Sequence, residues 1–104
     1  NGSASFTVGT VANVAGKSYY VSKVIAKVTT AFVGADELVI SDGTNTLMAA
    51  DEADLSEAGV YVVELGYENA TSGGATISAA IQSGGASASP TTGVVIVTAE
   101  YKQI

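Results

Sequence analysis

The sequence of 104 residues contains no histidine, cysteine, tryptophan or arginine. These side chains carry out most of the proton shuttling, thiol chemistry, soft-metal ligation and anion clamping in proteins. Their absence argues against an enzyme, and we expect no catalytic residue, no cofactor and no metal site. Without cysteine no disulfide supports the fold, but a chain of this length can bury a sufficient core without one.

Positive charge is also scarce, because four lysines stand against ten acidic residues and the formal net charge is −6. Binding to a nucleic-acid backbone or to an anionic membrane surface depends on lysine and arginine, so this composition disfavours both. Long hydrophobic runs are missing too. The longest, such as residues 94–97, fall far short of the roughly 20 residues that a membrane-spanning helix needs. We expect neither nucleic acid nor a membrane among the partners.

What the chain does contain is Val, Ile, Thr, Ala, Ser and Gly in short alternating segments, which are typical of β-strands and their turns. The alternation predicts strands at residues 5–11, 19–30, 37–41, 46–50, 60–65, 75–82 and 94–101. Seven or eight strands without an amphipathic helix between them favour an all-β fold, an antiparallel β-sandwich and specifically a jelly roll. Residues 1–104 form a single domain in this interpretation, with residues 1–5 as an extended N-terminal arm.

Two of these strands carry information about their surroundings. In residues 19–30, Tyr20 and Ser22 are predicted to share a face with Val24, Ala26 and Val28, and we assign Val24, Ala26 and Val28 to the core because two lysines lie opposite. The strand at 94–101 begins with branched residues on both faces. Such a strand is either central in its sheet or meets another subunit with its outer face.

Two short segments carry turn signals. Asp42 and Gly43 lie between apolar runs, and an Asp-Gly pair tolerates the positive φ angles that tight hairpins require. Residues 54–57 (Asp-Leu-Ser-Glu) match a capping box, and Gly59 is placed to end it. The sequence therefore predicts a hairpin turn at residues 42–45 and one short helical turn at residues 54–57.

The polar side chains suggest three candidate sites, each with a simpler structural interpretation. A group of carboxylates could ligate Ca²⁺, but its spacing does not match an EF-hand loop and a solvated acidic loop explains it as well. A carboxylate pair could serve glycoside hydrolysis, although carboxylates on outer strand faces are commoner as solubilising groups. Tyrosines could stack on sugars, whereas buried tyrosines bond their hydroxyls to the backbone. The residues are Asp51, Glu52, Asp54 and Glu57 for the first, Glu64, Glu68 and Glu100 for the second, and Tyr19, Tyr20, Tyr61, Tyr67 and Tyr101 for the third.

Several segments of the chain resemble a recurrent module of tailed-bacteriophage virion proteins. They are Lys23-Val24-x-x-Lys27-Val28-Thr29-Thr30-Ala31-Phe32, Ala35-Asp36 with Leu38-Val39-Ile40-Ser41-Asp42-Gly43, Asp54-Leu55 with Ala58-Gly59-Val60-Tyr61, and Thr92-Gly93-Val94 leading to Val97-x-x-Glu100-Tyr101-x-Gln103-Ile104. Together they cover most of the chain after residue 20. These are fold-determining residues and not a site, and Ser41 stands where such modules often carry glycine.

The resemblance implies a small jelly-roll virion protein, either a capsid decoration (cement) protein on the capsid surface or a related head-fibre or tail component. Its expected partners are the major capsid protein or other virion proteins, and a homotrimer or dimer would suit the symmetry of such sites. We expect inter-subunit contacts at residues 1–11 and 94–104, because termini and edge strands pair with added strands. The alternatives are a receptor- or glycan-binding module of a phage fibre or tail, and a β-sandwich domain of a bacterial surface or enzyme-associated protein.

Overall fold

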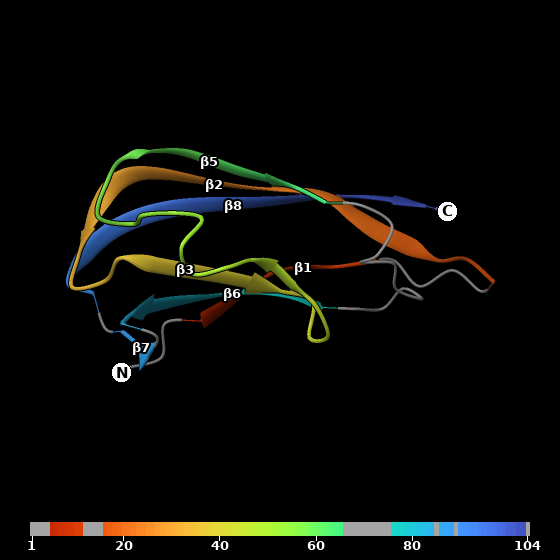
Figure 1. Cartoon of the computed structure of the whole chain (residues 1–104), viewed down its shortest axis with the longest axis horizontal. Helices are drawn as coiled ribbons and strands as arrows, with labels where there is room; N and C mark the ends of the chain where they lie inside the picture. The colour runs from red at the N-terminus through yellow and green to blue at the C-terminus, as the bar shows by residue number, and fades with distance from the viewer. Residues whose placement is uncertain (1–4, 12–15, 66–75, 85, 89, 104) are drawn as a thin grey trace.

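The protein is built from two antiparallel sheets packed face to face, as the computed structural model shows (Figure 1). The structure describes residues 5–11, 16–65, 76–84, 86–88 and 90–103. Its strands are β1 (Ser5–Thr10), β2 (Tyr19–Val33), β3 (Glu37–Ser41), β4 (Thr46–Met48), β5 (Gly59–Glu64), β6 (Thr76–Ser83), β7 (Ala86–Ser87) and β8 (Thr92–Gln103). One sheet has the order β1-β6-β3-β4, with β7 also paired to β6, and the other has the order β5-β2-β8.

This architecture confirms the predicted all-β sandwich, and most predicted strands lie where the alternation placed them. The strand at 37–41 has the predicted bounds, the one at 46–50 is shorter, and the short β7 lies in a segment expected to be a loop. The strand order does not by itself identify a jelly roll, so that finer assignment stays a prediction. Residues 1–4 of the predicted N-terminal arm lie outside the described residues, and Ser5 already belongs to β1. No helix in the described part of the chain is long and apolar enough to cross a bilayer.

The core lies between the two sheets and is supplied by alternate strand residues. Val24, Ala26 and Val28 of β2 face Leu38 and Ile40 of β3 across it, and all five are buried. Their burial follows from the period-2 geometry of strands, which sends every second side chain to the same face. The other buried apolar residues are Val11, Tyr19, Val21, Phe32, Ala35, Leu47, Met48, Ala53, Leu55, Ile77, Ala79 and Ala88.

Strand β2 continues over 15 residues because bulges shift its pairing with β8 without ending the strand. Its register with β8 shifts at three places, and each time the extra residue lies in β2. The first shift falls between Val21 and Lys23, so Tyr19 and Val21 are buried before it and Val24 is buried after it. A bulge of this kind moves the following side chains to the opposite face. The predicted shared face of Tyr20 and Ser22 with Val24 is therefore wrong, while the core assignment of Val24, Ala26 and Val28 is confirmed.

The predicted hairpin at residues 42–45 is confirmed, and a buried carboxylate organises it. Asp42 Oδ1 accepts hydrogen bonds from the backbone amides of Thr44 (2.9 Å) and Asn45 (2.6 Å), and Asp42 Oδ2 accepts one from Asn45 Nδ2. Gly43 has a φ of +94°, which explains the glycine at this position. The local sequence thus fixes the connection between β3 and β4.

The segment between β4 and β5 forms turns and not the predicted helical turn. Asp54 Oδ1 accepts bonds from the amide and hydroxyl of Ser56, while the amide of Glu57 donates to the carbonyl of Asp54. A capping box would need the Asp54 side chain to accept that Glu57 amide. Leu55 is also held by its backbone, which donates to the carbonyl of Asp36 and accepts from the amide of Phe32. These tertiary bonds tie the segment to the end of β2 and to the residue before β3.

Candidate assembly surfaces

The outer face of the β5-β2-β8 sheet carries a group of exposed apolar side chains. Val60 (59% exposed) and Val62 (50%) come from β5, and Val94 (49%) and Ile96 (53%) come from β8. Ile25 of β2, which is half-buried, lies between these strands, opposite Val62 on one side and Thr98 on the other. We call these five residues the apolar band. Large apolar side chains gathered on one exposed face are typical of a surface that docks onto another protein.

The apolar band also bears on the two interpretations of the last strand. β8 lies at one end of the order β5-β2-β8, so it is not a central strand covered by neighbours on both sides. Its inner residues Val95 and Val97 pack against the core, and its outer residues Val94 and Ile96 are exposed. Branched residues on both faces therefore agree with the second interpretation, in which the outer face meets another subunit.

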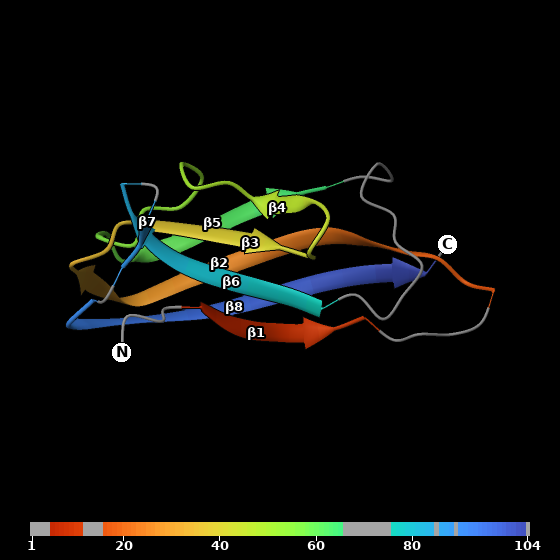
Figure 2. The ribbon, with the colours of Figure 1, turned by 90° about the horizontal axis from the view of Figure 1, so that it is seen from below.

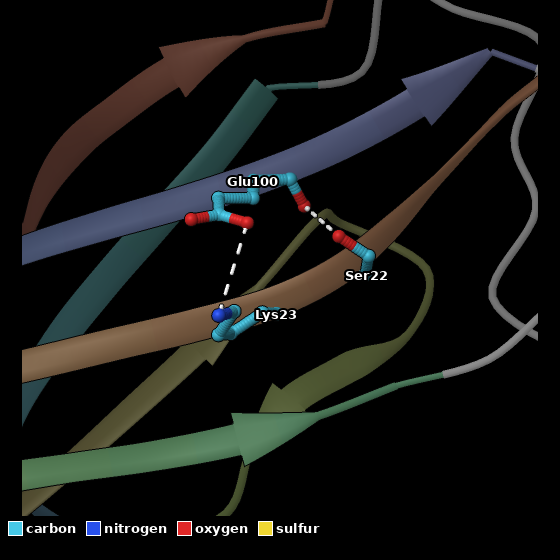
Figure 3. A network of polar contacts seen from close by, with 3 residues as sticks. All are labelled: Ser22, Lys23 and Glu100. Atoms are coloured by element: carbon cyan, nitrogen blue, oxygen red, sulfur yellow. Dashed lines mark hydrogen bonds and ion pairs between the residues drawn. The ribbon is translucent and has the colours of Figure 1, made fainter.

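One end of the apolar band is bordered by a group of one positive and two negative charges. Lys23 of β2 lies opposite Glu64 of β5 and Glu100 of β8, and its Nζ is 4.0 Å from Glu100 Oε1 (Figure 3). Ser22 Oγ donates to the carbonyl oxygen of Glu100 at 3.3 Å beside this pair. Both charged side chains are well exposed to solvent, so the ion pair contributes at most about 1 kcal/mol to stability. The group instead gives this end of the face a defined charge pattern.

A second feature lies at the margin of the sandwich, where β1 and β8 run along the same side (Figure 2). A cavity of about 240 Å³ opens there between the two sheets. Its walls are of mixed polarity and come from Val8, Gly9 and Thr10 of β1, Ile77 of β6, and Val97, Thr98, Ala99 and Tyr101 of β8. The ring of Tyr101 packs edge-on against the buried Tyr19, with centroids 5.6 Å apart.

The described tyrosines do not form one stacking platform. Tyr19 is buried, and the hydroxyl of Tyr61 donates to the carbonyls of Asp54 (2.9 Å) and Glu57 (3.1 Å). Tyr101 is 41% exposed and lines the cavity, Tyr20 is half-buried on β2, and Tyr67 lies outside the described residues. The interpretation of tyrosines as structural residues with bonded hydroxyls is thus confirmed for Tyr61.

The candidate carboxylates are dispersed as well. Glu52 Oε1 accepts from the amide of Ala49, and Asp54 accepts from Ser56, so both serve local turns. Among the residues that the structure describes, no three acidic side chains gather as a metal site would require. Glu64 and Glu100 flank Lys23 on an open face and do not enclose a cleft, and Glu68 lies outside the described residues.

Part of the apolar band could be predicted from the sequence, but the cavity could not. The alternation in β8 showed apolar residues on both faces, and the same signal was present in Val60 and Val62 of β5. The cavity forms because β1 and β8 lie at the same margin of the two sheets. The alternation of apolar residues shows which face of a strand is buried, but it does not show the order of the strands. Comparison of the chain with known proteins finds no matching family model, no matching curated protein and no matching solved structure.

Proposed function

We propose that the protein is a non-enzymatic structural protein of a phage virion, which decorates and stabilises the capsid surface through many equivalent contacts. The observation that carries this proposal is the apolar band on the outer face of the β5-β2-β8 sheet, where Val60, Val62, Val94 and Ile96 are about half exposed. The resemblance of the sequence to virion modules supports a phage virion as the assembly in question. Its partners are the major capsid protein or other virion proteins.

The charge distribution supports docking by this face onto a large assembly. The chain has a net charge of −6, yet on the outer face of this sheet Lys23, Lys27 and Lys102 stand against Glu64 and Glu100. Lys27 lies opposite Val60 and Ile96, inside the apolar band. A near-neutral apolar face can approach an acidic surface without the repulsion that the rest of the molecule would produce. Weak contacts of this kind add up when many copies bind at equivalent positions.

The proposal is tested by co-sedimentation of the protein with purified expanded phage capsids over a range of concentrations. We expect saturable binding, which Ile96→Asn reduces because it places an amide in the middle of the apolar band. Thr76→Asn is the matched control, because Thr76 is an exposed strand residue of the other sheet. Binding that both variants leave unchanged would overturn the docking face. Absence of capsid binding together with hits on a glycan array would favour the alternative of a glycan-binding fibre or tail module.

A further inference from the structure

The two sheets differ in width, and the cavity lies beside the narrower one. Four strands lie abreast in the order β1-β6-β3-β4, whereas the facing sheet has only β5, β2 and β8. Strand β1 lines one wall of the cavity and β8 lines the other, with Ile77 of β6 also in the lining. Within the described residues, β8 is paired only to β2. In the described part of the chain the narrower sheet thus ends at β8, directly beside the cavity.

The backbone of β8 presents hydrogen-bonding groups on its unpaired side. The carbonyl oxygens of Val94 and Glu100 accept bonds from the Thr29 and Ser22 hydroxyls of β2, so these even-numbered residues direct their carbonyls toward β2. Successive residues of a strand direct their backbone groups to opposite sides. The N–H and C=O groups of Val95, Val97 and Ala99 therefore point away from β2, and the side chains of Val97 and Ala99 line the cavity.

The first part of this edge lacks the features that usually prevent strand addition. Proteins block free edges with charged residues, proline or bulges, but residues 94–99 (Val-Val-Ile-Val-Thr-Ala) contain no charge and no proline, and the charges of β8 (Glu100 and Lys102) follow them. The three register shifts between β2 and β8 place every extra residue in β2, so β8 itself runs without a bulge. Residues 94–99 thus form a regular, uncharged edge, and the side chains of Val97 and Ala99 line the cavity beside it.

We propose that the edge of β8 is a docking slot for an extended segment of another protein chain, which adds to the β5-β2-β8 sheet as a fourth strand. The segment carries apolar side chains at every second position, which enter the cavity, and it is uncharged along its paired length. A volume of about 240 Å³ lies below the roughly 300–1,000 Å³ of small-molecule sites, so it suits inserted side chains. This slot goes beyond the proposed docking face, because it lies at the edge of the sheet and not on its outer surface.

Gly9 provides a variant that fills the slot without disturbing the fold. A Cβ atom added at Gly9 meets nothing within 4 Å, its φ is not in the positive range, and the residue lines the cavity. Gly9→Leu should therefore occupy the cavity and leave the melting temperature equal or higher. Gly59→Leu is the matched control, because an added Cβ there makes only ordinary contacts and Gly59 lies in β5, at the far edge of the same sheet.

The test uses the full chain and a synthetic peptide of about ten residues, a common strand length, that alternates valine and threonine between terminal lysines. We expect the peptide to bind in solution and to slow hydrogen exchange of the amides of Val95, Val97 and Ala99. Gly9→Leu should weaken binding about tenfold or more, the effect of excluding a buried apolar side chain, and Gly59→Leu should not. A version of the peptide with central prolines should not bind.

Three results would overturn the slot: no binding of the alternating peptide, equal binding to Gly9→Leu, or protection of amides outside β8. Concentration-dependent doubling of mass in light scattering, abolished by Gly9→Leu, would overturn the foreign segment in favour of a second copy of this chain. These measurements contain no capsid, whereas the docking face is tested with capsids and Ile96→Asn. Failure of one proposal is therefore distinguishable from failure of the other.

Discussion

Single residues in this protein act mainly by satisfying backbone groups in the connections. Asp42 is the clearest case, because it is the one charged side chain buried among the described residues and its carboxylate accepts three hydrogen bonds within its own turn. Tyr61 does the same at longer range by binding two carbonyls of the segment between β4 and β5. Among the polar residues considered as candidate sites, Glu52, Asp54 and Tyr61 are thus engaged in holding turns.

At Asp42 we expect substitution by alanine to destabilise the protein. Asp42→Ala leaves the amides of Thr44 and Asn45 without their acceptor in a partly buried turn, which costs about 1–3 kcal/mol of unfolding free energy. Urea denaturation followed by circular dichroism measures this change. Asp42→Asn keeps an acceptor oxygen and should lose less, and Asp51→Ala, at an exposed position, should change the free energy by less than about 0.5 kcal/mol. Equal stability of Asp42→Ala and wild type would contradict this account.

At the scale of elements, alternation predicted strands well and connections less well. The bounds of β3 and the core side of β2 followed directly from period-2 patterning. The phase change at Ser22 did not, because a bulge depends on the partner strand and leaves no mark in one strand's pattern. The capping box at residues 54–57 did not form, because the Asp54 side chain accepts from Ser56 while the Glu57 amide donates to the Asp54 carbonyl. The apolar band was visible in the sequence in part, and the cavity was not.

The connection between β4 and β5 is part of the core, and Leu55 should prove essential to it. Its side chain is fully buried in a segment with no regular secondary structure. Leu55→Ala should lower the unfolding free energy by about 2–5 kcal/mol, because the cavity left by the missing side chain adds to the lost burial. Leu55→Met conserves volume and should cost less than about 1.5 kcal/mol. Thermal and urea unfolding of the three proteins measure the difference, and a loss below 1 kcal/mol for alanine would show that the segment is not packed as described.

At the scale of the whole molecule, the protein is an elongated sandwich of 44 × 26 × 19 Å. We assign a partner to two of its surfaces. The broad outer face of the β5-β2-β8 sheet carries the apolar band, and one margin carries the slot beside β8. We propose that virion proteins bind the first surface and that an extended segment of another chain binds the second. In both proposals the molecule contributes contacts and rigidity to a larger assembly.

Stability of the whole molecule should not depend on divalent cations. In the described residues no group of acidic side chains could hold a metal ion, and Glu52 and Asp54 are engaged in local hydrogen bonds. We therefore expect millimolar EDTA to leave the melting temperature unchanged in differential scanning calorimetry. A fall in melting temperature that added Ca²⁺ reverses would reveal a structural ion and would support Ca²⁺ ligation by the carboxylates of residues 51–57.

The pairing of β2 with β8 also has a consequence for synthesis on the ribosome. The hydrogen bond from Ser22 to Glu100 joins residues 78 positions apart. At about 5–20 residues per second, the ribosome needs roughly 4–16 s to make the chain between them. During that interval β2, with its buried apolar side chains, has no partner along one whole side. A nascent chain of this protein therefore exposes one side of its central strand until β8 (Thr92–Gln103) has been made, and this interval is the period when we expect it to depend most on chaperones.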